Sequence, residues 1–135
     1  MSENTAAPYQ TALVTGGTGG LGSAVTAHLL DRGWRVVVPW LVKEELERVP
    51  EHPNLVLVQA DLSEQTALDD VIQVASAETD APLFGLVNLV GGFTSGHRVH
   101  EEPAAVLDAQ LNLNVRTAYT VTQAALPHLI RGGGG

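Results

Sequence analysis

A run of glycines near the N-terminus contains the residue types best suited to chemistry with a phosphate group. It lies between a short apolar segment, residues 11–15, and a longer segment with helical spacing. Glycine permits a tight turn and lets the backbone approach a pyrophosphate closely, while the first N–H groups of the following helix favour an anion. The run consists of Thr15, Gly16, Gly17, Thr18, Gly19, Gly20, Leu21 and Gly22.

This run predicts nucleotide binding, and a plain tight turn is the alternative interpretation. The strand expected before it and the helix expected after it favour the nucleotide. A P-loop is excluded, because the run does not end in Gly-Lys-Ser or Gly-Lys-Thr.

The elements that must position this run follow a regular alternation. Short runs rich in Val and Leu alternate with segments of helical spacing, which is typical of repeated βαβ units. Because the expected strands are apolar almost throughout, we expect them to be buried on both faces of a doubly wound parallel α/β sheet. Strands are expected at residues 11–15, 35–39, 55–59 and 84–90, and helices at residues 21–32, 43–49, beyond Ser63 and 103–130.

Three details of the helices are also expected from the pattern. In the first helix, Leu21, Val25 and His28 or Leu29 should face the sheet. Ser63 can cap the helix that follows it. Pro127 should kink or end the last helix.

The composition limits the number of domains and the kinds of binding partner that can be expected. A chain of 135 residues with 44% hydrophobic and 16% charged residues fits one globular domain. Residues 1–10 and the glycine tail, residues 132–135, are expected to be flexible. With a formal net charge of −8 and only seven scattered Lys and Arg residues, nucleic acid is not an expected partner.

The sequence also bears on the cellular compartment. It holds no cysteine, which excludes disulfides and suits a reducing cytoplasm. The N-terminus resembles neither a secretory signal nor a transit peptide, and no apolar run approaches the roughly 18 residues of a membrane span. We therefore expect a soluble, cytoplasmic protein without membrane partners.

The pattern Thr-Gly-x-x-x-Gly-x-Gly at residues 15–22 resembles the cofactor fingerprint of the short-chain dehydrogenases/reductases. That resemblance implies a Rossmann-like fold with strand order 3-2-1-4, here truncated after about four strands. Asp61 and Leu62, just after the third expected strand, are similar to the pair that the family places near the adenine ring. A turn or helix-capping role is the alternative for Asp61.

Two further segments resemble the family. Asn88-Leu89-Val90-Gly91 is similar to the Asn-Asn-Ala-Gly motif that steadies the sheet and lines the cofactor, although Leu and Val replace its second and third residues. Gly91 therefore carries over more safely than Asn88. Asn114 matches the asparagine that interrupts the family's fourth helix and holds a water of the proton relay, which makes it the one catalytic candidate; Asn112 ranks below it.

The resemblance also implies which catalytic residues to look for. Family members use a serine and a Tyr-x-x-x-Lys motif, which would follow Gly135. The only lysine is Lys43, and Tyr9 and Tyr119 have Leu13 and Gln123 four residues on. Without a lysine to lower the pKa of a tyrosine, the chain has no residue that can act as the general acid. We therefore expect this polypeptide alone to transfer no hydride.

The choice between NAD and NADP stays open. Dinucleotide-binding folds often place an acid about 20 residues beyond the glycines, where this chain has Pro39 and Trp40. Neither an acid nor an arginine stands there, although Lys43 is near in the sequence. Trp40 is a candidate for stacking on adenine, or else packs against the short helix.

A histidine-containing segment, residues 97–102, is the one place that suggests a metal. His97 and His100 are followed by Glu101 and Glu102, which would suit zinc on a helix. We expect instead a loop that is solvated or faces substrate, and no metal.

Three functions of different class fit these observations. The first is a fragment of an NAD(P)-dependent oxidoreductase acting on an alcohol or carbonyl substrate, which we favour. The second is a non-catalytic dinucleotide-binding module. The third is a self-associating assembly protein, because a sheet that ends after the fourth strand exposes an edge. A homo-oligomer is expected in either the first or the third case.

Overall fold

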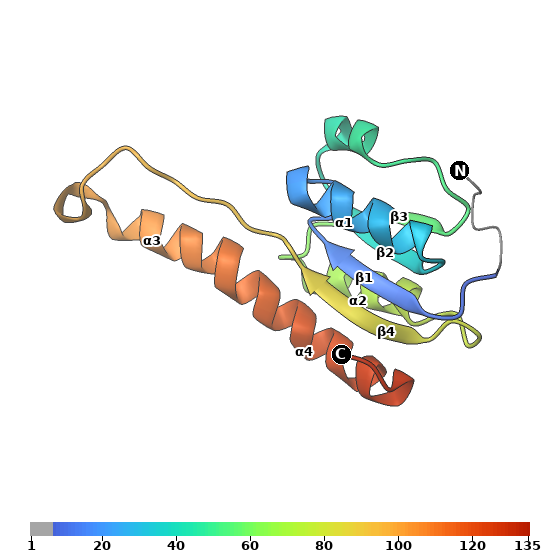
Figure 1. Cartoon of the computed structure of the whole chain (residues 1–135). Helices are drawn as coiled ribbons and strands as arrows, with labels where there is room; N and C mark the ends of the chain where they lie inside the picture. The colour runs from blue at the N-terminus through green and yellow to red at the C-terminus, as the bar shows by residue number, and fades with distance from the viewer. Residues whose placement is uncertain (1–6) are drawn as a thin grey trace.

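The computed structural model describes residues 7–135, so the expectation for the first ten residues falls mostly outside it. Four parallel strands form one sheet in the order β3-β2-β1-β4 (Figure 1). The predicted parallel sheet and strand order 3-2-1-4 are therefore confirmed. The strands are β1 (Thr11–Thr15), β2 (Arg35–Trp40), β3 (Leu55–Gln59) and β4 (Leu83–Asn88).

The remaining elements cover the sheet or follow its strands. They are α1 (Gly20–Asp31), the 3-10 helix η1 (Lys43–Arg48), α2 (Gln65–Ala75), the 3-10 helix η2 (Val99–Glu101), α3 (Ala104–Leu111), the π-helix η3 (Asn112–Arg116) and α4 (Thr117–Gly132). Helix α1 covers one face of the sheet, and α2 and α4 cover the other (Figure 1). No helix among residues 7–135 is long and apolar enough to cross a membrane.

Side chains alternate along the central strands, so each strand contributes to two separate cores, one on each face of the sheet. Leu13 and Val37 point to the face where α2 and α4 pack, and they are fully buried there. Their neighbours Val14 and Val36 point to the opposite face, beneath α1. Burial on both faces is thus confirmed for β1 and β2. The edge strands β3 and β4 are only partly buried, since each has a neighbour on one side.

The buried face of α1 agrees with the expected one only in part: Val25 and Leu29 pack against the core beneath the helix as expected, but Leu21 does not. Gly22, Thr26 and Leu30 are buried, whereas Leu21 is 68% exposed and His28 is exposed. Small residues mark this face because the helix comes very close to the backbone of the turn before it. Thr26 donates its hydroxyl hydrogen bond to the carbonyl of Gly17, at 3.1 Å.

The residue expected to cap α2 was wrong, and Pro127 does not end the last helix. Glu64, not Ser63, is the N-cap of α2, because the Ser63 hydroxyl is bonded to Asp61 instead. Pro127 lies inside α4, which continues to Gly132 and ends where Gly133 adopts a φ of 78°. A left-handed glycine after the last helical residue is a common helix end.

The glycine tail contacts the exposed edge of β4. The N–H of Gly135 donates to the carbonyl of Phe84 at 2.9 Å, and the N–H of Leu86 donates to the carbonyl of Gly135 at 3.3 Å. The tail was expected to be a linker without packing partners. Its backbone instead pairs with β4, and glycine allows this because a side chain at Gly134 would collide with the Phe84 carbonyl.

Arg35 is a buried cation at the opposite end of the sheet from the glycine-rich turn. Its guanidinium donates to the carbonyls of Val74 at 3.0 Å and Ala75 at 3.4 Å, and to the Thr11 hydroxyl at 3.4 Å. Burial lowers the pKa of Arg35, while the charge of Glu78 acts to raise it. The side chain supplies hydrogen bonds to two carbonyls in the last turn of α2, where the helix itself leaves carbonyls incompletely satisfied.

Replacing Arg35 should therefore destabilise the domain. We expect Arg35→Met to lower the free energy of unfolding by about 1–3 kcal/mol, because buried carbonyls would lose their donors. Urea unfolding followed by circular dichroism measures the change. Arg32→Met is the control, since Arg32 is exposed and its hydrogen bond is to exposed His28. Equal losses in the two variants would contradict the role of Arg35.

Candidate dinucleotide site

The glycine-rich turn joins β1 to α1 by a backbone path that excludes side chains. Gly16 has a φ of +69°, and a Cβ on it would lie 2.7 Å from the carbonyl carbon of Leu89. A Cβ on Gly22 would overlap the carbonyl oxygen of Gly16. Residues 16 and 22 must therefore be glycine for β1, α1 and the end of β4 to meet as they do.

The outer side of the same turn is open. Gly19 is the N-cap of α1, and a Cβ on Gly20 would meet nothing within 4 Å. The first N–H groups of a helix have no partners within it. Gly20 and the exposed Leu21 thus present main-chain amides at the positive end of α1, which is an arrangement suited to an anion.

Thr15 differs from the glycines in what it contacts. Its side chain is buried, and its hydroxyl donates to Asn88 Oδ1 at 3.3 Å and accepts from the N–H of Leu89 at 3.2 Å. Asn88 in turn donates to the Thr122 hydroxyl of α4 at 3.0 Å. Thr15 and Asn88, two predicted cofactor contacts, therefore join β1, β4 and α4.

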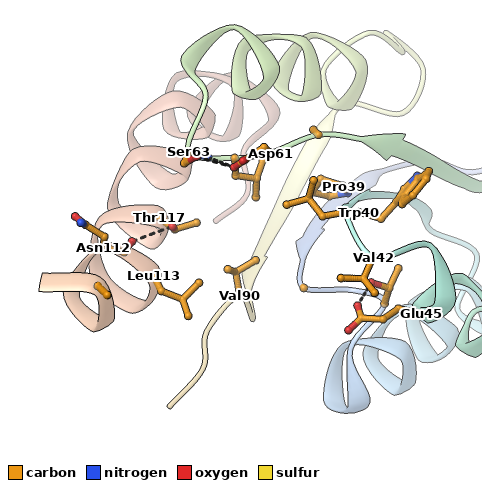
Figure 2. A pocket seen from close by; sticks show the side chains of 16 residues that line it. Pro39, Trp40, Val42, Glu45, Asp61, Ser63, Val90, Asn112, Leu113 and Thr117 are labelled. Carbon is orange, nitrogen blue, oxygen red and sulfur yellow. Dashed lines mark hydrogen bonds between the residues drawn. The ribbon is translucent and has the colours of Figure 1, made fainter. Parts of the chain in front are cut away.

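A cavity of about 450 Å³ opens beside the turn, at the carboxyl ends of the strands. Figure 2 shows Asn112, Leu113 and Thr117 on one side of it and Pro39, Trp40, Val42 and Glu45 on the other, with Val90 between them. The cavity lies where β1 has β2 on one side and β4 on the other. Open α/β sheets bind ligands at such a switch point.

The structure brings several of the predicted cofactor residues to this one cavity. The predicted residues that line it are Gly16, Thr18, Trp40, Asp61 and Leu62. Trp40 ends β2, where it pairs in register with Gln59 of β3. Its stacking on adenine stays a prediction.

Asp61 begins a tight turn at the rim of the cavity. Its Oδ1 accepts hydrogen bonds from the Ser63 hydroxyl at 2.7 Å and from the Ser63 N–H at 3.0 Å. These two donors lower the pKa of Asp61, and slight desolvation opposes them. Both readings of Asp61 are thus compatible with the structure, since a turn aspartate also lines the cavity.

Asn114 and Asn112 lie in different surroundings, and the ranking of Asn114 above Asn112 stays a prediction. Asn114 Oδ1 accepts from the N–H of Gly92 at 2.9 Å, and its Nδ2 donates to the Gln110 carbonyl at 3.0 Å. A Cβ on Gly91 would lie 2.7 Å from Asn114 Oδ1, so the loop and the helix touch here. Asn112, which ranked second, is the asparagine that lines the cavity.

The π-helix η3 explains why this part of the long helix faces the cavity. Its wide turn lets the Thr117 hydroxyl donate to the Asn112 carbonyl, five residues back, at 3.1 Å. Asn112, Leu113 and Thr117 all line the cavity. Single π turns often occur at functional sites. The sequence predicted an interruption near Asn114 only through the family resemblance.

Glu45 is a lining residue that the sequence did not single out. Its Oε2 accepts a hydrogen bond of 2.8 Å from the buried hydroxyl of Thr18, 27 residues earlier. Arg48 Nη1 donates to the Thr18 carbonyl at 3.4 Å and lies 3.6 Å from Glu45 Oε1. These contacts connect helix η1 to the glycine-rich turn, and no local sequence motif predicts them.

The histidine-containing segment lies apart from the cavity. His97 pairs with Glu102 at 3.1 Å and His100 with Glu101 at 3.8 Å, and the expected loop contains η2. Within residues 7–135, no group of three or more His, Cys, Asp or Glu side chains is arranged to hold a metal ion.

Comparisons with known proteins agree on one family. A family model described as short chain dehydrogenase matches residues 10–135. NADPH-dependent aldehyde reductase 2, a chloroplastic protein of Arabidopsis thaliana, is 28% identical over 92% of this chain and 52% of its own length. The chain thus spans about half the length of this curated relative.

Solved structures share the architecture. A short-chain dehydrogenase/reductase from Serratia marcescens matches with a TM-score of 0.76 and 26% identity, over 90% of this chain and 51% of that one. Serine dehydrogenase from Escherichia coli matches with a TM-score of 0.80, over 93% and 59% of the two chains; at 23% identity it supports the fold alone. With the family model matched almost from end to end, the chain belongs to the short-chain dehydrogenase family of oxidoreductases.

Proposed function

We propose that residues 7–135 bind NAD or NADP as the cofactor-binding part of an oxidoreductase that acts on an alcohol or a carbonyl compound. The observation that carries this is the open helix N-terminus at Gly19 and Gly20, next to a cavity at the switch point of the sheet. The pyrophosphate would bind the amides of the turn. The adenosine would extend towards Trp40, Asp61 and Leu62.

The finer roles rest on the family resemblance together with the contacts. Gly91 and Asn88 would border the nicotinamide end of the cofactor, near the loop that Asn114 holds. Asn114 would retain a water of the proton relay. The plant relative is named as an aldehyde reductase, which makes a small carbonyl compound the first substrate class to test. A cytoplasmic location stays a prediction.

Two alternatives from the sequence stay open. A non-catalytic dinucleotide-binding module would use the same turn and cavity. Self-association is favoured by a row of exposed apolar side chains along α3, η3 and α4, so a homo-oligomer stays part of the proposal. The row comprises Leu107, Leu111, Val115, Tyr119, Leu126 and Ile130.

A bulky residue at Gly20 should block the cofactor without harming the fold. We expect Gly20→Val to weaken NAD or NADP binding at least roughly tenfold, because the side chain would occupy the open side of the turn where the backbone must approach the pyrophosphate. Isothermal titration calorimetry measures the affinity, and thermal unfolding checks the fold.

Ala24→Val is the matched control, because it adds the same β-branched side chain to an exposed position of the same helix. Its affinity should equal that of the unmodified protein. Retained binding in Gly20→Val would show that the pyrophosphate does not lie on this turn.

The Asp61 turn predicts a pH dependence. Because Ser63 donors lower the pKa of Asp61, its carboxylate stays ionised at a lower pH than an ordinary aspartate. Ser63→Ala removes the hydroxyl donor and should raise that pKa towards its usual value, as followed by NMR titration of the carboxyl carbon. If ionised Asp61 supports adenosine binding, affinity in the variant should begin to fall at a higher pH.

Ser76→Ala is the control for that titration, since Ser76 lies beyond the far end of α2 and bonds Ile72. It should leave the pKa of Asp61 unchanged. An unchanged pKa in Ser63→Ala would contradict the origin assigned to the shift.

The 135-residue polypeptide should show no turnover by itself. Its sequence has no Tyr-x-x-x-Lys, so no tyrosine has a lysine to lower its pKa. The measurement is consumption of NADH or NADPH with aldehyde and ketone substrates, followed by absorbance. A rate that Asn114→Ala abolishes would overturn this expectation and would assign catalysis to residues present in this chain.

A further inference from the structure

The charged side chains that line the cavity are of one sign. Among residues 7–135 they are Glu45 and Asp61, which come from η1 and from the turn after β3. Lys43, the nearest lysine in sequence, lines a different hollow together with Glu44, Leu46 and Glu47. The sequence alone left open whether Lys43 would reach the cofactor, and the structure places it elsewhere.

Among the described residues, Arg48 is the one cation bonded to this part of the site, and it is paired with Glu45 on the same helix. Its Nη1 donates to the Thr18 carbonyl and lies 3.6 Å from Glu45 Oε1. Counting Glu45, Asp61 and Arg48 together, two negative charges and one positive charge leave a net charge of −1 around this side of the cavity.

The hydrogen bond from Thr18 determines where the Glu45 carboxylate lies. Thr18 belongs to the glycine-rich turn and is 3% exposed, so its hydroxyl is a fixed donor. Glu45 is thereby held between the turn and the end of β2, on the same wall as Trp40 (Figure 2). In dinucleotide-binding βαβ units the adenosine ribose lies at this place, and NADP differs from NAD by a phosphate on that ribose.

We propose that Glu45, held by Thr18, makes this site select NAD over NADP. The inference rests on the proposed dinucleotide binding and adds the choice of cofactor to it. A ribose hydroxyl can donate to a carboxylate, whereas a ribose phosphate brings a second anion against it. Glu45 comes from η1 rather than from the end of the second strand, where an acid is usually sought. The α1 N-terminus contributes nothing to the choice, because it faces the pyrophosphate that both cofactors share.

The test compares NAD⁺ and NADP⁺ binding to the same 135-residue chain by isothermal titration calorimetry. We expect NAD⁺ to bind roughly tenfold more tightly or better at low salt, and the ratio to shrink as salt screens the charges. Glu45→Gln keeps an oxygen that can accept from Thr18 but removes the charge. It should raise the affinity for NADP⁺ and reduce the ratio several-fold.

Glu47→Gln is the matched control. It makes the same charge change on the same helix, but Glu47 lines the other hollow, so the ratio should not move. Thermal unfolding of each variant checks the fold, and the comparison on the unmodified chain does not depend on any variant.

The outcomes distinguish a failure of the role proposed for Glu45 from a failure of the proposed dinucleotide binding. Equal or tighter binding of NADP⁺ by the unmodified chain would overturn the role of Glu45 and leave dinucleotide binding intact. An equal change of the ratio in Glu45→Gln and Glu47→Gln would also overturn it, because net charge alone would explain the effect. Failure to bind either dinucleotide would overturn the proposed function itself.

Discussion

The contact between the backbone of Gly16 and that of Gly22 is the constraint on which the site depends. The chain must leave β1, reverse and enter α1 within a few residues, and no Cβ fits between the turn and the first turn of the helix. Because the approach is so close, the positive end of α1 lies at the carboxyl edge of the sheet. The amides that begin the helix then lie next to the turn whose residues Gly16 and Thr18 line the cavity.

The strand order also creates the cavity that lies beside the glycine-rich turn. In the order β3-β2-β1-β4, the chain crosses from one edge of β1 to the other after β3. The segments that follow β2 and β3 therefore form one wall of the cavity, and the loop after β4 with the π-helix forms the other. Residues from distant parts of the sequence therefore share one cavity.

Side-chain hydrogen bonds then hold these walls in place. Thr15 and Asn88 join β1 to β4 and α4, Asn114 joins the loop after β4 to the long helix, and Thr18 joins the turn to η1 through Glu45. Each of these bonds links segments that are far apart in sequence. The bond from Thr18 is the one among them that holds an acidic side chain at the cavity.

The sequence by itself determined the strands, their parallel arrangement and the place of the glycine-rich turn, because these follow from local periodicity and from the steric freedom of glycine. The strand order came from the family resemblance. Residues 55–59 were expected as a strand and form β3. Features that depend on contacts between distant segments were decided only by the tertiary structure.

The buried face of α1 also includes Gly22 and Thr26 because these residues pack against the turn, a contact that hydrophobic spacing cannot predict. Asn112 lines the cavity while Asn114 bonds the loop after β4, and Lys43 and Glu45, two residues apart, face different hollows. The sequence could not predict the pairing of Gly135 with β4 either, since glycines carry no side chain whose pattern would indicate a partner.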